Sequence, residues 1–252
     1  MNTSRFKIIT PNGLDDYRER AGGIAEDSWP EFMLNDPIAG ENWHELFDRF
    51  NEYQFALLDM ENDRMAAMAN SLPFYWDQPL EDLPECGWDW VFLKAVEDHK
   101  KGIQPNIQSA IQINIHPDYQ NQGLSPRMVQ AMRAIGKSKG FKYLVAPVRP
   151  SQKSQYPLIS IDDYVLWTNE AGLPFDAWLR VHARMGARII KPCHESMAIP
   201  GSRADWEAWT GMKFPQTGQY VIPGALNPME MNAEENKGVY VEPNVWMVHE
   251  IA

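Results

Sequence analysis

The stretch SAIQINIHPDYQNQGLS, residues 109–125, decides the expected fold of this chain. Its first half alternates, with isoleucine at every second position from 111 and polar side chains between them, which is typical of a strand with one apolar face. Pro117 ends that strand, and the polar segment DYQNQG follows it as a turn. Ser125 and Pro126 then predict a helix start, with the serine as N-cap and the proline at the first helical position.

The predicted helix leads back to a second strand. Met128, Met132 and Ile135 recur at helical spacing, Gly140 ends the helix, and residues 143–148 (YLVAPV) follow as a strand. Two strands joined by a helix through short connections form a right-handed parallel unit. Further elements around it make the fold class α+β with a mixed sheet. Strands are expected at residues 5–10, 55–60, 65–70, 188–199 and 239–248 (the last broken at Pro243), and helices at 87–99 and 175–186.

Composition narrows the class of protein. The 252 residues are 44% hydrophobic and 23% charged, which is ordinary for a globular chain. The N-terminus has no secretory signal and no run of about 18 apolar residues occurs, so no membrane span is expected and the cytoplasm is the expected location. Two cysteines in unrelated contexts, Cys86 and Cys193, agree with a reducing compartment.

Charge and histidine spacing exclude two further classes. The formal net charge of −11 weighs against a nucleic-acid partner, because a surface that follows phosphates needs clustered Lys and Arg. The acidic surface either steers a cationic or amine substrate or serves solubility alone. No metal is expected, because the adjacent pairs His194–Glu195 and His249–Glu250 lack metal-ligand spacing.

The turn at residues 120–125 has the features of an anion site. A tight turn into a helix points free backbone N–H groups at one spot, and the helix dipole adds positive potential. Such sites hold phosphate or pyrophosphate groups. Gly123 removes a Cβ where a phosphate would approach, and Arg127 could add a charge-assisted contact. By spacing alone, an ordinary strand–turn–helix that binds nothing fits equally well.

Residues 115–125 resemble the signature of the GNAT superfamily of acyl-CoA-dependent acyltransferases: an apolar strand, a proline, then Q/R-x-x-G-x-G/A at a helix start. Gln120 and Gly123 occupy its fixed positions, and Ser125 stands where Gly or Ala is usual. The resemblance implies that acetyl-CoA or a related acyl-CoA is the cosubstrate. In the family the turn binds the CoA pyrophosphate and the strand pairs with pantetheine, which here implies Ile113, Ile115, Gln120, Asn121, Gln122, Gly123, Leu124 and Ser125, with Arg127 beside them.

The resemblance also implies an architecture. It covers roughly residues 105–200. A mostly antiparallel, twisted sheet flanked by helices is then expected around the central parallel unit. The chain 1–252 becomes a single GNAT-like domain, with an N-terminal part (1–104), an acyl-CoA-binding core (105–200) and a C-terminal extension (201–252).

A later helix supplies the candidate catalytic residue. Family members end this helix with Y-x-K/R-x-G-F, and their Tyr can protonate the departing CoA thiolate. Residues 182–187 (HARMGA) match that register with His182 in place of the Tyr, and a GNAT-like group in polyketide loading modules also uses a His. Trp178, His182 and Met185 share one helical face, which predicts partial burial of the imidazole. His182 is therefore either a general acid or a structural ring packed beside Trp178.

The predicted function is acyl transfer from acetyl-CoA by direct attack of a small-molecule amine, because no credible nucleophile lies in the matched region. Asn114 either orients a water that accepts the amine proton or makes a structural hydrogen bond, and His116 is expected to face solvent. Two alternatives stay open. One is transfer or decarboxylation on an acyl carrier protein thiol, and the other is a non-catalytic acyl-CoA sensor. The sequence leaves the acceptor, the acyl group and the oligomeric state open.

Overall fold

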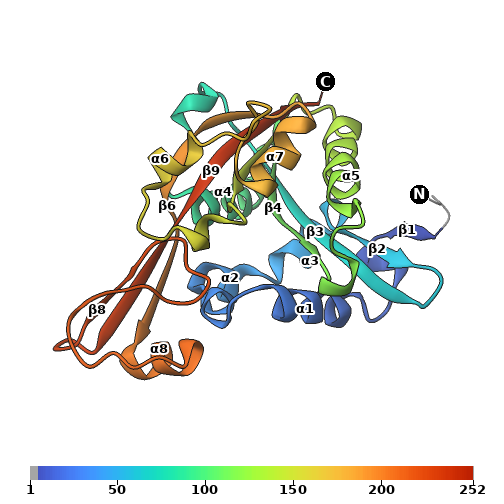
Figure 1. Cartoon of the computed structure of the whole chain (residues 1–252). Helices are drawn as coiled ribbons and strands as arrows, with labels where there is room; N and C mark the ends of the chain where they lie inside the picture. Colours follow the sequence, from blue (N-terminus) through green and yellow to red (C-terminus); the bar gives the residue numbers. More distant parts are fainter. Residues whose placement is uncertain (1–4, 252) are drawn as a thin grey trace.

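The computed structural model describes residues 5–251, and within them nine strands form one sheet (Figure 1). The strand order is β1–β2–β3–β4–β5–β9–β8–β7, and β6 pairs with β9 outside this path. Every strand pair is antiparallel except β4 with β5. The bounds are β1 Phe6–Ile9, β2 Phe55–Asp59, β3 Arg64–Phe74, β4 Ile107–Ile115, β5 Tyr143–Val148, β6 Arg188–Ser202, β7 Gly218–Tyr220, β8 Met229–Asn232 and β9 Lys237–Glu250.

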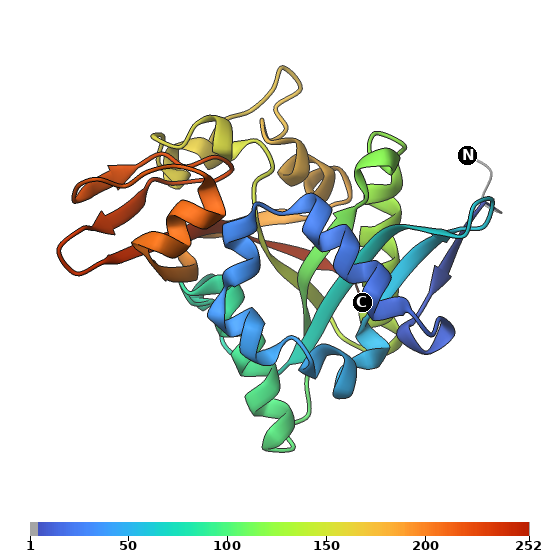
Figure 2. The same cartoon turned by 90° about the horizontal axis from the view of Figure 1, so that it is seen from below.

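The α-helices cover this sheet. In Figure 1, α1 and α2 run along the lower side of the central strands and α5 and α7 along the upper side, and Figure 2 shows α1 and α2 crossing in front of them. This arrangement confirms the expected α+β class with a mixed, mostly antiparallel sheet. The bounds are α1 Tyr17–Ser28, α2 Pro37–Asn42, α3 Glu45–Asp48, α4 Gly87–Lys100, α5 Leu124–Ser138, α6 Ile161–Val165, α7 Ala177–Arg184 and α8 Arg203–Thr210. None of the helices within residues 5–251 has the length and apolarity that a bilayer span requires.

The predicted parallel unit forms from β4, α5 and β5, with a short pairing. Only two register pairs join the strands, Gln108 with Leu144 and Ser109 with Val145. Beyond these pairs the strands separate, although both continue for several residues. The backbone groups that face the gap lack the partners that a continuous ladder would provide, so the gap can accept an extended polar ligand.

The helix after the turn begins two residues earlier than predicted, so Pro126 is not its first residue. The helix begins at Leu124 with Gly123 as its N-cap, so the expectation that Ser125 is the N-cap was wrong. Asn121 (φ 59°) and Gly123 (φ 71°) both adopt the left-handed conformation, and these two reversals turn the chain into the helix earlier. Glycine takes this conformation at little cost, which explains why the serine side chain is not needed as a cap.

Two other boundaries also differ. The helix expected over 175–186 is α7, which begins after the N-cap Asp176 and ends two residues before Gly186. β9 runs unbroken through Pro243, where an interruption was expected. The partner strand absorbs the irregularity instead, because the register of β6 against β9 skips between Cys193 and Met197. A proline cannot donate to a ladder, and a bulge in the neighbouring strand removes the need for that donor.

Candidate active site

A cleft of about 1270 Å³ opens where β4 and β5 separate. Its walls come from the diverging strands, from the turn before α5, from α1 and α2, and from the inner face of α7. The volume exceeds that of a typical small-ligand pocket and suits a long cosubstrate together with an acceptor. Most of the predicted site residues line it, namely Ile113, Asn114, Ile115, Gln120, Asn121, Gly123, Leu124, Ser125 and His182.

One end of the cleft has the backbone features of an anion site. The first N–H groups of α5 have no intrahelical acceptor, and the helix dipole places positive potential at the same point. Gly123 is exposed there, so a ligand can approach the main chain without meeting a side chain. The geometry therefore has the features from which phosphate binding was predicted.

Two residues that were predicted to contact CoA, Arg127 and Gln122, instead donate hydrogen bonds to backbone carbonyl oxygens of the protein. Arg127 donates through Nη2 to the carbonyl oxygen of Phe6 at 2.7 Å, which ties the first turn of α5 to β1. Gln122 donates through Nε2 to the carbonyl oxygen of Asp118 at 3.0 Å, across the turn itself. Neither side chain lines the cleft. Both brace the turn in this structure.

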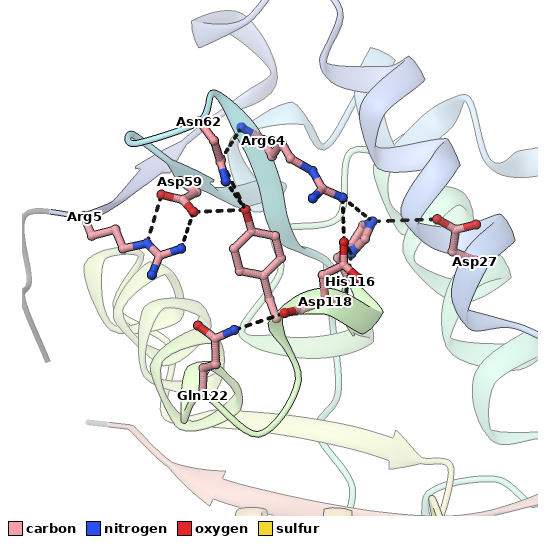
Figure 3. A network of polar contacts seen from close by, with 9 residues as sticks. Arg5, Asp27, Asp59, Asn62, Arg64, His116, Asp118 and Gln122 are labelled. Atoms are coloured by element: carbon pink, nitrogen blue, oxygen red, sulfur yellow. Dashed lines mark hydrogen bonds and ion pairs between the residues drawn. The ribbon is translucent and has the colours of Figure 1, made fainter.

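A polar network holds the turn in place from behind (Figure 3). The Tyr119 hydroxyl donates to Asp59 at 3.0 Å, and Asn62 donates to the same hydroxyl at 3.0 Å. Arg5 binds Asp59 from the other side through Nη2 at 2.7 Å, and this hydrogen bond holds the pKa of the Asp59 carboxyl well below its usual range. Because the carboxylate is buried and charged, the network fixes the hairpin β2–β3 against the turn.

His116 lies at the same network and not simply in solvent, so that expectation was wrong. Its Nδ1 accepts from the backbone N–H of Asp118, and its Nε2 lies 3.2 Å from Arg64 and 3.8 Å from Asp27 (Figure 3). The ring therefore caps the short helical turn that precedes residue 120. It is a structural part of the turn that precedes α5.

Asn114 is buried on β4, with only 5% of its surface exposed, and it lines the cleft. Its Nδ2 has no hydrogen-bond partner among residues 5–251. A buried amide donor without a partner costs free energy, so a structural hydrogen bond from Nδ2 does not explain its burial. The orphan donor is available to a ligand or a water in the cleft.

His182 lies on α7 at the other end of the cleft. Asp176 caps this helix by accepting from the backbone N–H groups of Trp178 and Leu179, and it also accepts from the Tyr164 hydroxyl at 3.0 Å. The cap fixes where the helix begins and thus which side chains face inward. The lining positions on this helix are Ala177, Trp178, Val181 and His182.

The imidazole of His182 is 2% exposed and packs edge-on against Trp178, with ring centroids 4.5 Å apart. Its Nδ1 lies 2.9 Å from Nε2 of His249 on β9. Burial and the neighbouring His249 lower the pKa of His182 to about 3. Burial was predicted, but Met185 does not share the cleft face as expected; it caps α7, and its carbonyl accepts from Arg133.

His249 is a candidate site residue, because its Nε2 lies 2.9 Å from Nδ1 of His182, and sequence reasoning missed it. Alternation in the terminal strand placed His249 and Glu250 on opposite faces, and the structure agrees, since the histidine is buried and the glutamate is exposed. His249 and Glu250 lack metal-ligand spacing, so nothing in the local sequence gives His249 a role. Only the fold brings it to His182: β9 pairs with β5, where His249 lies opposite Leu144, and this pairing places His249 beneath α7.

Three carboxyl groups lie close to one another beside the cleft, of which those of Asp36 and Glu242 are buried and that of Asp89 is half-buried. Glu242 lines the cleft and pairs with Arg149 at 2.7 Å. Asp36 is 1% exposed, and one of its oxygens, like one oxygen of Asp89, has no partner within residues 5–251. Burial raises the pKa of Asp36 to about 6 with a further contribution from Glu242, and burial together with Asp36 raises the pKa of Asp89 to about 8.

The cysteines are free, with Cys86 exposed and Cys193 buried, and neither lines the cleft. Burial raises the pKa of the Cys193 thiol to about 12, so this thiol stays protonated at neutral pH. Residues 5–251 contain no group of three or more His, Cys, Asp or Glu side chains arranged to hold a metal ion.

Comparisons with known proteins identify the family to which this chain belongs. No protein-family model matches the chain. An arginine N-acetyltransferase, avaD of Aspergillus versicolor, is 32% identical over 249 residues, which is 88% of this chain and 85% of the relative. This chain belongs to the GNAT superfamily.

Solved structures agree on the fold of this GNAT enzyme. The loading GNATL domain of CurA from Lyngbya majuscula superposes with a TM-score of 0.65 at 20% identity, covering 98% of each chain. The GphF GNAT-like decarboxylase, solved with isobutyryl-CoA, superposes with a TM-score of 0.55 at 13% identity, covering 98% of this chain and 100% of that one.

The family assignment settles the class of reaction. This GNAT protein is an acyl-CoA-dependent acetyltransferase-like enzyme, and the alternative of a non-catalytic acyl-CoA sensor is set aside. Members of this family use an acyl-CoA as cosubstrate.

Proposed function

We propose that this enzyme transfers the acetyl group of acetyl-CoA to the amine of arginine or of a closely related guanidino compound. The observation that carries the acceptor is the pair of unpartnered carboxyl oxygens on Asp36 and Asp89, beside the cleft residue Glu242. Buried carboxyl groups without a cation carry a large desolvation cost, and a guanidinium can satisfy two of them through its planar donors. The name of the 32% identical relative agrees with this acceptor class.

Asp36 and Asp89 do not line the cleft themselves, but each keeps one buried oxygen without a hydrogen-bond partner within residues 5–251. Asp36 uses Oδ1 to cap α2 by accepting from the backbone of Ala39 at 2.7 Å, which leaves Oδ2 free. Asp89 accepts from the backbone of Ala198 at 3.2 Å, which leaves Oδ1 free. Arg149 is committed to Glu242 and to the carbonyl oxygen of Gly224. A bound guanidinium would therefore supply the positively charged donor that the free oxygens of Asp36 and Asp89 lack within residues 5–251.

At the phosphate end, the N-terminus of α5 would bind the pyrophosphate of CoA through backbone N–H groups of residues 120–125, as expected from the motif. The pantetheine arm would extend along the free edge of β4 past Ile115 and Ile113, where β5 no longer pairs. This path runs toward Asn114 and His182, which both line the cleft. Asn114 Nδ2 would then donate to the thioester oxygen or to a bound water.

The reaction is a direct transfer. The acceptor nitrogen attacks the thioester carbon, the C–N bond forms, the C–S bond breaks, and the electron pair leaves with sulfur. The proton lost by the nitrogen balances the proton gained by the CoA thiol. His182 would donate a hydrogen bond to the departing sulfur. The two cysteines lie outside the cleft, which supports a route without an acyl-enzyme. We further propose a cytoplasmic setting, on the basis of the two unpaired cysteines.

The test is acceptor preference. L-arginine should be acetylated with a kcat/KM about 100-fold above that of L-norleucine, which keeps the amine and lacks the guanidinium, with free CoA thiol and product mass as readouts. Asp36→Asn and Asp89→Asn should each raise the KM for arginine about 10-fold and leave the dissociation constant of acetyl-CoA unchanged.

Glu41→Gln, an exposed acid on α2, is the matched control and should behave as the wild type. Equal rates with arginine and norleucine would overturn the guanidinium site. Faster transfer to the phosphopantetheine thiol of an acyl carrier protein than to any amine would overturn amine acetylation and favour the carrier-protein alternative.

A further inference from the structure

Two histidines from distant parts of the chain form one buried unit at the end of the cleft. His182 Nδ1 and His249 Nε2 lie 2.9 Å apart, and the two residues are 2% and 1% exposed. His182 lines the cleft, and since Nδ1 is occupied, Nε2 is the ring nitrogen left for a ligand. The proton in the shared hydrogen bond decides whether Nε2 is a donor or an acceptor.

The orphan nitrogen of His249 distinguishes the two possible tautomers. His249 Nδ1 has no partner among residues 5–251. If His182 donated, His249 would carry its own proton on Nδ1, as a buried N–H with no acceptor. If His249 donates through Nε2, its Nδ1 is a bare acceptor, and under-used acceptors are more readily tolerated inside proteins than orphan donors.

The charge around His249 favours the same tautomer. The Arg133 guanidinium on α5 donates to the carbonyl oxygens of Met185 and of Glu250, the residue next to His249, and its charge contributes to lowering the pKa of His249. A fixed cation disfavours protonation of His249 and attracts a bare lone pair. The Glu250 side chain, next along β9, is exposed and offers no compensating buried anion. Both imidazoles are thus neutral, in agreement with the lowered pKa values of about 3 and about 4.

We propose that His249 is a positioning residue that donates to His182 Nδ1 and thereby holds His182 as the neutral tautomer with its Nε2–H directed to the thioester sulfur. This inference rests on the proposed acyl transfer. A neutral imidazole stabilises the departing thiolate through a hydrogen bond and keeps its own proton, while the acceptor nitrogen's proton goes to sulfur. His182 then needs no protonation step, and its activity does not depend on an imidazolium.

Variants of His249 separate positioning from packing. His249→Gln can still donate to Nδ1 through its amide and should keep kcat within about 3-fold of the wild type. His249→Met fills a similar volume without a donor and should lower kcat about 10- to 100-fold, with the KM for acetyl-CoA unchanged. His249→Glu accepts instead of donating, so His182 becomes titratable and the pH profile of kcat should gain a new inflection between pH 6 and 8.

Nitrogen NMR of the ¹⁵N-histidine-labelled enzyme tests the tautomer without any acceptor. His182, assigned with His182→Ala, should show a protonated Nε2 and a bare Nδ1 at pH 7, and its pattern should persist in His249→Gln. A protonated Nδ1 or an imidazolium signal for His182 would overturn the proposal, as would a wild-type kcat in folded His249→Met. Failure of arginine as acceptor would leave the NMR result unchanged, so the two proposals fail separately.

Discussion

The two ends of the cleft are constructed in different ways. The end proposed to bind phosphate comes from one continuous stretch, the end of β4 and the turn into α5, and its donors are backbone groups at an exposed glycine. The end proposed to hold the acyl group and the acceptor draws side chains from α2, α4, α7 and β9, and nearly all of them are buried. A backbone site needs only local conformation, whereas a buried side-chain site depends on packing between distant segments. The two ends should therefore respond to different changes.

The largest expected effect is at the buried end. His182→Ala should lower kcat about 10² to 10⁴-fold, because it removes the proposed donor to the departing sulfur. The dissociation constant of acetyl-CoA, measured by calorimetry, should change less than about 3-fold. His182→Tyr should retain part of the activity, since the family places Tyr there. A near-wild-type kcat in folded His182→Ala would show that the ring is structural.

The next largest effect is expected at the turn before α5, where backbone N–H groups form the proposed site. Gly123→Trp should weaken acetyl-CoA binding about 100-fold, because a large side chain covers the exposed N–H groups and its φ of 71° strains any residue with a Cβ. Gly123→Asn is the matched control, since Asn tolerates this conformation and is small, and it should lose no more than about 10-fold. Equal acetyl-CoA affinity in folded Gly123→Trp would remove the turn from the binding site.

Two groups at the buried end, His182 and Asp89, couple protons to stability with opposite signs. The folded-state pKa of His182 lies below its unfolded value, so the unfolded chain binds protons first and stability falls as pH drops from about 6.5 toward 3. Asp89 has the opposite sign, because its raised pKa makes stability fall as pH rises from about 4 to 8. In urea unfolding across pH 4–8, the slope of the unfolding free energy against pH should become more negative below pH 6.5 in His182→Phe and more positive between pH 4 and 8 in Asp89→Asn, each relative to the wild type. Each bound proton changes the slope by about 1.4 kcal/mol per pH unit. Unchanged slopes in both variants would contradict the assigned pKa directions.

A smaller effect is expected for Arg127, which braces the turn from behind. Arg127→Ala removes the hydrogen bond to the Phe6 carbonyl and should lower the free energy of unfolding by about 1 kcal/mol. The affinity for acetyl-CoA should change less than about 3-fold. Arg133 lies on the same helix and also donates to backbone carbonyl oxygens, but near His249. The loss of unfolding free energy in Arg133→Ala can therefore be compared with that in Arg127→Ala. A 10-fold loss of affinity in Arg127→Ala would restore its predicted role in phosphate binding.

The smallest effect is expected for the thiols. The double variant Cys86→Ala/Cys193→Ala should keep turnover within about 3-fold, because neither cysteine lines the cleft and the Cys193 thiol is protonated at neutral pH. Loss of turnover with normal folding and acetyl-CoA binding would favour a covalent intermediate over direct attack.

Sequence alone was sufficient where chemistry follows from neighbours in the chain. The alternation before residue 116, the glycine of the turn and the apolar face of the following helix predicted the parallel unit and the anion site, since period and φ preference are local properties. His182 could be named because its register matched a family helix. The position of the helix start at Leu124 was missed, because the left-handed Asn121 cannot be inferred from its type alone.

Only the tertiary structure decided which side chains meet. His249 contacts His182 because β9 pairs with β5 and passes beneath α7, a relation between residues 67 positions apart that no spacing rule encodes. Asp36, Asp89 and Glu242 come from three separate elements, and each would be a solvated surface acid if it were considered singly. Burial makes them unusual, and burial depends on the whole fold, because removing a charge from water requires every element that encloses it.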